Sequence, residues 1–158
     1  MTISSISAET RATELGLDLH APAAPVAAYV PANQSGNLVF ISGQIPIRDG
    51  SVMMRGIVGD TVTLEQAREC ARQCAINGLA AVKAHAGSLD GIARVVRVGC
   101  FVACGPGFGD QPKVANAASE LLIDVFGDAG RHARAAVGCS SLPLNVPVEI
   151  EFLFELKT

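Results

Sequence analysis

The sequence predicts an α+β domain, with helices packed on one face of a single β-sheet. Two segments, 63–87 and 112–126, carry apolar residues at helical spacing, and residues 146–156 alternate between apolar and polar side chains as a strand does. The predicted elements follow the order helix, strands, helix, strand, helix, strands. We find no internal repeat, low-complexity segment or domain boundary, so residues 1–158 are expected to form one domain.

Composition and charge exclude several classes of protein. The chain has 158 residues, of which 49% are hydrophobic and only 4% aromatic, so its core is expected to be aliphatic. A net charge of −3 argues against nucleic-acid binding, which usually needs a basic surface with stacking aromatics. No apolar run approaches the roughly 18 residues of a membrane helix. Five cysteines without a signal peptide predict reduced thiols and a cytoplasmic location.

The N-terminal third is expected to hold one short helix and two short strands. Ser7 to Leu15 is a helix candidate, with Ser7 as its N-cap and Gly16 as its stop. Residues 21–34 are rich in Pro and Ala, which predicts extended coil or an edge strand. Residues 37–42 form a strand that ends at Gly43, and residues 44–48 form a second strand that enters a tight Asp-Gly turn.

The first long helix begins with a capping box and has a face of small residues. Thr63 and Gln66 can satisfy each other's free backbone amides, and Gly87 ends the helix. Its inward positions are mostly Ala, Cys and Gly, so it should lie close against the sheet. The pattern then predicts a strand over 95–104, a helix over 112–126 that stops at Gly127, and strands over 134–139 and 146–156.

Arg134 and Glu149 are the most informative pair of charged residues. They are nearly equidistant from the centre of the connection between the last two strands, so a hairpin would place them opposite each other. Glu149 lies on the face away from the aliphatic stripe. The pair is therefore either a surface ion pair or a pocket in which the arginine binds a carboxylate and the glutamate handles a water or a proton.

Three short motifs follow one another along the chain. They are Tyr29-Val30 after a Pro-Ala segment, the run 42–46 (Ser-Gly-Gln-Ile-Pro), and the C-terminal run 134–151 with its Arg-Ala-Ala-Val-Gly, Leu-Pro and Val-Glu-Ile-Glu segments. In this order they resemble the Rid family, the YjgF-like imine deaminases that have also been labelled L-PSP endoribonucleases. The resemblance covers about residues 20–156. Residues 1–20 are then an extra N-terminal segment with a short helix.

The resemblance implies a fold, an assembly and a reaction. The fold is a chorismate-mutase-like domain with helices on one face of a mixed sheet, assembled as a homotrimer with sites between subunits. The implied reaction converts a 2-imino acid to a 2-keto acid and ammonia without metal or cofactor. Arg134 matches the residue that binds the substrate carboxylate, and Glu149 matches the one that activates water. Tyr29, Ser42 and Asn116 match residues that line the pocket.

Two departures from the family pattern point to a divergent branch. Deaminases of the family commonly carry Cys two residues after the arginine, where this chain has Ala136, so that wall of the substrate site differs. The residue before Tyr29 is Ala28, where proline is usual. The natural substrate therefore need not be an imine derived from an amino acid. The alternative function is a non-catalytic protein that binds keto acids. A ribonuclease fits the net negative charge and the few aromatic residues less well.

The remaining candidates fit structural roles better than chemical ones. Cys70 and Cys74, like Cys100 and Cys104, could suggest zinc, but buried structural thiols fit an Ala-rich face better. The glycine-rich run 105–109 lacks the Lys-Ser/Thr of a phosphate loop and is expected to be a turn. The three histidines, His20, His85 and His132, are isolated in the sequence, and only His132 lies near a predicted site residue.

Overall fold

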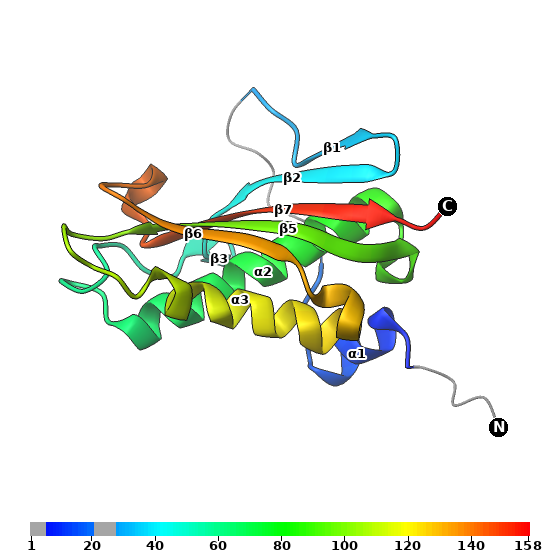
Figure 1. The fold of residues 1–158 in the computed structure, drawn as a ribbon, viewed down its shortest axis with the longest axis horizontal. Helices are drawn as coiled ribbons and strands as arrows, with labels where there is room; N and C mark the ends of the chain where they lie inside the picture. Colours follow the sequence, from blue (N-terminus) through cyan, green and yellow to red (C-terminus); the bar gives the residue numbers. More distant parts are fainter. Residues whose placement is uncertain (1–5, 21–27) are drawn as a thin grey trace.

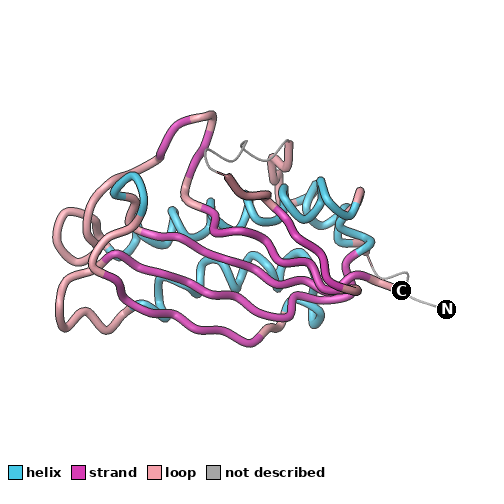
Figure 2. Tube along the Cα trace, turned by 90° about the horizontal axis from the view of Figure 1, so that it is seen from above, coloured by secondary structure: helices cyan, strands magenta, loops and turns pink. Residues whose placement is uncertain are grey.

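The computed structural model describes residues 6–20 and 28–158, and it has the predicted α+β architecture. Three helices pack on one face of a mixed five-stranded sheet with the order β1-β2-β7-β5-β6 (Figure 1). The elements are α1 (Ala8–Glu14), β1 (Ala32–Ser35), β2 (Leu38–Gln44), β3 (Ile47–Arg48), β4 (Ser51–Val52), α2 (Leu64–Ala86), β5 (Ile92–Ala103), α3 (Gln111–Phe126), β6 (Ala133–Cys139) and β7 (Val148–Leu156), with 3₁₀ turns η1 (Leu89–Gly91), η2 (Gly127–Gly130) and η3 (Pro143–Asn145). Seen from above, the sheet covers the two long helices (Figure 2).

Helix α2 lies close against the sheet, as its small residues predict. The capping box is confirmed: the Thr63 hydroxyl accepts from the Gln66 amide, and the Gln66 side chain accepts from the Thr63 amide. At Gly78 a Cβ would lie 2.5 Å from the ring of Phe152 on β7, so only glycine allows this approach. Gly87 ends the helix with a φ of +82°, a conformation that glycine adopts without strain.

The alternation in the last strand marks the two faces of the sheet. The side chains of Val148, Ile150, Phe152 and Phe154 are buried in the core beneath the helices. The intervening Glu149 and Glu151 therefore point to the other face, which no helix covers in Figure 1. The strand predicted over residues 44–48 is shorter in the structure, where β3 spans only Ile47–Arg48. Asp49 and Gly50 form the tight turn of the β3–β4 hairpin, as predicted.

The last two strands do not pair as a hairpin, so the condition for placing Arg134 opposite Glu149 is not met. Strand β6 pairs in parallel with β5, and β7 pairs antiparallel with the opposite edge of β5, so that β5 separates them. Strands β5 and β6 are joined through α3, the crossover connection that parallel pairing requires. The short segment from β6 to β7 passes the end of β5 instead of forming a turn between neighbours.

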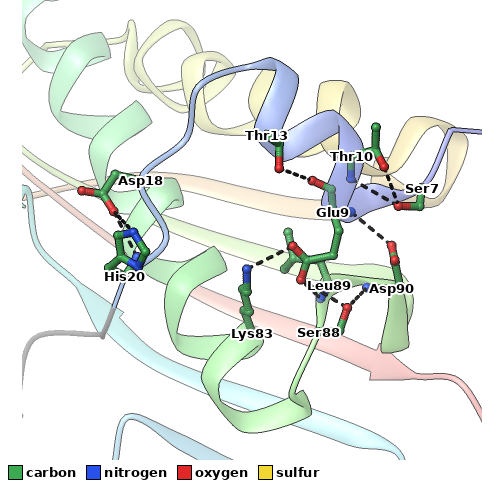
Figure 3. A network of polar contacts seen from close by, with 10 residues as sticks. All are labelled: Ser7, Glu9, Thr10, Thr13, Asp18, His20, Lys83, Ser88, Leu89 and Asp90. Carbon is green, nitrogen blue, oxygen red and sulfur yellow. Dashed lines mark hydrogen bonds and ion pairs between the residues drawn. The ribbon is translucent and has the colours of Figure 1, made fainter.

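Helix α1 is anchored to the end of α2 by one carboxylate (Figure 3). As predicted, Ser7 caps this helix, its hydroxyl accepting from the Thr10 amide. The Glu9 carboxylate accepts from Lys83 Nζ at 3.0 Å and from the Leu89 amide at 2.9 Å. Burial acts to raise the pKa of Glu9, but these hydrogen bonds and the Lys83 charge outweigh it and lower that pKa.

Replacing Glu9 by glutamine should destabilise the protein by about 1–2 kcal/mol at neutral pH, because the variant loses a charged acceptor for three hydrogen bonds, from Lys83, Ser88 and Leu89. The pKa of Glu9 is lower in the folded protein than in the unfolded chain. The carboxylate therefore stabilises the fold fully above its unfolded pKa, and this stabilisation is lost as the pH falls through its folded pKa. We expect the difference in melting temperature between wild type and Glu9→Gln to shrink steadily below about pH 4.3. Glu14→Gln, an exposed position on the same helix, is the control and should show no such difference.

Candidate active site

Arg134 is fixed by helix α3 at the edge of the sheet. Its Nη1 donates to Asn116 Oδ1 at 2.9 Å and to Ser119 Oγ at 3.1 Å. The structure thus brings together Arg134 and Asn116, two of the residues that the sequence singled out. Both Nη1 hydrogens are used, and Nε and Nη2 have no partner among the described residues. Those two nitrogens form the side of the guanidinium that can bind a carboxylate with two hydrogen bonds.

Ser119 and His132 extend this arrangement behind Arg134. His132 Nε2 lies 2.9 Å from Ser119 Oγ, and His132 Nδ1 lies 2.6 Å from the Gly130 carbonyl oxygen. Burial lowers the pKa of His132, and the Arg134 charge lowers it further, while the contact with Gly130 acts in the opposite direction. The sequence did not single out Ser119, although it lies three residues after Asn116 and therefore on the same side of α3.

Glu149 lies on the face of the sheet that the helices leave uncovered. Its carboxylate packs against the backbone of Gly43 on β2, where any Cβ would overlap with it. Burial raises the pKa of Glu149, and the neighbouring Glu151 carboxylate raises it further. A carboxyl group with a raised pKa is suited to accept and return a proton near neutral pH.

Tyr29 and Ser42 lie on the same face as Glu149. Ser42 Oγ donates to the Val30 carbonyl at 2.7 Å and so ties the segment that carries Tyr29 to β2. Both residues line a cavity of about 530 Å³ together with apolar and charged side chains of the neighbouring strands, among them Phe40, Arg97, Glu151 and Leu153. Tyr29 is half exposed. Glu149 is not among the residues that line this cavity; its carboxylate lies against Gly43, the residue after Ser42.

The predicted site residues therefore form two separate groups. The arginine half-site comprises Arg134, Asn116 and Ser119, and the glutamate half-site comprises Glu149, Ser42 and Tyr29. Along β5, Arg134 pairs with Val98 and Glu149 pairs with Phe101. Positions three residues apart on a strand point to opposite faces, so one chain does not bring the guanidinium and the carboxylate together. Their expected juxtaposition across a hairpin is wrong.

The position of the missing family thiol is next to a different cysteine. Ala136 is partly buried on the Arg134 side of β6 and pairs with Cys100 on β5. Burial raises the pKa of the Cys100 thiol to about 12, although the Arg134 charge acts to lower it. Cys100, beside Ala136 on the neighbouring strand, is therefore a neutral thiol and supplies no thiolate to the arginine half-site.

Three of the four cysteines that were predicted to be buried are buried, and Cys104 is only partly buried. All five are free, and Cys70, Cys74 and Cys100 are buried. Within residues 6–20 and 28–158, no group of three or more His, Cys, Asp and Glu side chains is placed to hold a metal ion.

The glycine-rich run 105–109 leads into α3, as expected of a turn. None of the helices in the described part of the chain has both the length and the apolar character to span a membrane.

Residues 9–156 match the family model described as YjgF/chorismate mutase-like, a description that also carries an endoribonuclease label. The chain belongs to this family. The resemblance in the sequence motifs is thereby confirmed, and so is the chorismate-mutase-like fold with helices packed against a mixed sheet.

Relatives of this YjgF-like chain include one whose name states an activity. A protein of Dermatophagoides farinae named 2-iminobutanoate/2-iminopropanoate deaminase is 32% identical over 84% of this chain and 89% of its own length. Protein TCP17 of Trypanosoma cruzi is 42% identical over 90% of both chains. The crystal structure of Atu1372 from Agrobacterium tumefaciens, a protein with unknown function, is 47% identical, covers 95% of this chain and 92% of its own, and superposes with a TM-score of 0.86.

Proposed function

We propose that this protein hydrolyses imines or enamines of small 2-oxo acids, with no metal or cofactor taking part in the reaction. The observation that carries the proposal is the orientation of Arg134, whose Nη1 is held by two acceptors of α3 while its Nε and Nη2 have no partner in the described part of the chain. A relative that is 32% identical bears the name of a deaminase of 2-iminobutanoate and 2-iminopropanoate, which supports this class of substrate.

The chemistry needs only a positioned water and a base. Arg134 binds the substrate carboxylate, and the Glu149 carboxylate takes a proton from water as the water oxygen attacks the C=N carbon. The resulting tetrahedral carbon carries a hydroxyl and an amine. This carbinolamine forms when the proton held by Glu149 passes to the imine nitrogen. Glu149 then takes the hydroxyl proton and passes it to the amine, the C=O bond forms as the C–N bond breaks, and the 2-oxo acid and ammonia leave. The imine nitrogen thus departs with the hydrogens of the water, and the carbonyl keeps the water's oxygen.

A second copy of the chain completes the site in this proposal. The two half-sites lie on opposite faces of the sheet, with Arg134 on the edge strand β6. Strand β6 has a free edge within the described sheet, and the uncovered face exposes Phe40 and Val137. An edge strand and apolar side chains on an open face favour association. The trimer that the family resemblance implies would place Arg134 of one subunit at Glu149 of the next.

Mixing two impaired variants tests the shared site. Arg134→Ala and Glu149→Gln, each assayed alone on 2-iminobutyrate generated in the cuvette, should each show about a hundredth of wild-type activity or less. After unfolding and refolding together at equal concentration, about a quarter of the interfaces should pair an intact arginine with an intact glutamate, so about a quarter of wild-type activity should return. Failure to regain activity, with assembly confirmed by light scattering, would place both residues in one chain's site and contradict the shared one.

A non-catalytic binding protein is the second candidate, and Ala136 is the observation that favours it. The thiol found at that position in family deaminases is replaced here, and Cys100 beside it stays protonated. Binding of 2-oxobutyrate without any hydrolysis of 2-iminobutyrate would support this function and exclude the enzyme. Detectable turnover that depends on Glu149 would exclude the binding protein instead.

A further inference from the structure

The hydrogen bonds behind Arg134 have only one consistent arrangement of protons. The Gly130 carbonyl oxygen can only accept, so His132 Nδ1 at 2.6 Å carries a hydrogen and donates it. In the neutral ring Nε2 is then the acceptor, and it receives the Ser119 hydroxyl hydrogen across 2.9 Å. The Ser119 oxygen is left as an acceptor for Arg134 Nη1, which lies 3.1 Å away.

We propose that Ser119 and His132 are positioning residues that orient Arg134 for the substrate carboxylate, and that protonation of His132 releases Arg134 from this orientation. The proposal rests on the proposed role of Arg134 in binding the carboxylate. Neither residue touches the substrate; both act through the guanidinium.

Protonation changes the direction of one hydrogen bond. A proton on His132 Nε2 makes that nitrogen a donor, so it would donate to Ser119 Oγ and the serine hydroxyl hydrogen would lose its acceptor. The Ser119 oxygen then accepts from two positively charged donors, His132 Nε2 and Arg134 Nη1, which compete for it. The imidazolium also adds a second positive charge beside the guanidinium, and the two repel each other. Both effects displace Arg134 from Ser119.

The other charged groups around His132 are mostly engaged elsewhere. In η2, Arg131 pairs with Asp128, and on β5 Arg97 pairs with Glu151 across the uncovered face. On α3, Lys113 pairs with Asp110 and Glu120 pairs with Arg68. Asp124 of α3 lies in the groove against α2, and Arg11 of α1 reaches Gly127. Among the described residues, Arg134 is the charged group that acts on the pKa of His132.

Binding of 2-oxobutyrate as a function of pH tests the proposal. In the wild type we expect the dissociation constant to be constant above the ordinary histidine pKa of about 6.5 and to rise about tenfold as the pH falls below it. His132→Gln keeps a neutral acceptor for Ser119 and should bind with the same affinity across this range. Ser119→Ala should bind about tenfold more weakly at neutral pH and should show a smaller acid dependence than wild type, because only the charge repulsion remains. His85→Gln is the control: His85 is exposed and contacts Gln34 of β1, so this variant should keep the acid dependence of the wild type.

The titration of Glu149 cannot imitate this result. Protonation of Glu149 removes a negative charge from the site, so it would strengthen the binding of an anion at acid pH. A second readout is the pKa of His132 measured by NMR, which Arg134→Ala should raise because the neighbouring positive charge is gone.

The two proposals fail in different ways. If Arg134→Ala abolishes binding but wild type and His132→Gln show the same acid dependence, the positioning role is wrong and the proposed function stands. An unchanged His132 pKa in Arg134→Ala would overturn the coupling itself. If Arg134→Ala binds 2-oxobutyrate as wild type does, the carboxylate-binding role of Arg134 is wrong, and the proposed function fails with it.

Discussion

Replacing Arg134 by alanine should weaken 2-oxobutyrate binding by about a hundredfold or more, while the fold stays intact. The loss follows from removing two charge-assisted hydrogen bonds to one carboxylate, each of which is worth about 1.5–3 kcal/mol. Arg134 is exposed at a sheet edge and bonds only to Asn116 and Ser119 within the described residues, so its removal leaves the core unchanged. Calorimetric titration measures the affinity, and circular dichroism with a thermal melt checks the fold.

Two further variants show whether geometry or charge matters at Arg134. Arg134→Lys keeps the positive charge but loses the planar pair of donors, so its affinity should fall between those of wild type and Arg134→Ala. Arg131→Ala removes an exposed arginine three residues away that pairs with Asp128, and it should bind as wild type does. Equal loss of 2-oxobutyrate affinity in Arg131→Ala and Arg134→Ala would mean that the loss comes from general surface charge and not from a specific contact of Arg134.

Replacing Glu149 by glutamine should lower the rate of imine hydrolysis by about 10²–10⁴-fold, the usual contribution of a positioned general base. The amide cannot take a proton from water, yet it fills the same space against Gly43. Binding of 2-oxobutyrate should therefore be retained. Steady-state hydrolysis of 2-iminobutyrate measures the rate, and calorimetry measures the binding; equal rates in Glu149→Gln and wild type would exclude Glu149 as the base.

The pH dependence of imine hydrolysis also tests the role of Glu149. Glu149 must be ionised to act as a base, and burial followed by the Glu151 charge raises its pKa, so the rate should begin to fall at a higher pH than an exposed glutamate would give. Glu151→Gln removes that neighbouring charge and should move the fall to lower pH. Glu155→Gln, on the same face of β7 and paired with Arg94, should leave the profile unchanged.

Local patterns were sufficient for the secondary structure because each signal lies within a few residues of the element that it describes. The capping box at Thr63, the glycine stop at Gly87 and the alternation that leads to Phe154 all depend on contacts along the chain or on one face of one element. The predicted strand over 95–104 begins earlier, at Ile92, since strand ends depend on pairing partners.

The candidate site was only partly predictable from the sequence. The motifs identified Arg134, Glu149, Tyr29, Ser42 and Asn116, and the structure brings Arg134 to Asn116 and places Ser42 with Tyr29. Ser119 and His132 were missed as a pair because they come from different elements that meet only when α3 packs beside β6. No spacing in the sequence encodes that contact.

The sequence by itself determined most of the helices and strands and the family, and it supplied the residues of the candidate site, because these follow from periodicity, capping and short motifs. Only the tertiary structure decided that β5 lies between β6 and β7, and with it that Arg134 and Glu149 occupy opposite faces of the sheet. Strand order is set by the crossover through α3 and by pairing between segments far apart in the chain. Neither can be recognised from the alternation of apolar and polar residues within one strand. The feature that the sequence suggested as a pair in one hairpin is therefore, in the folded protein, two half-sites for which we propose a second subunit.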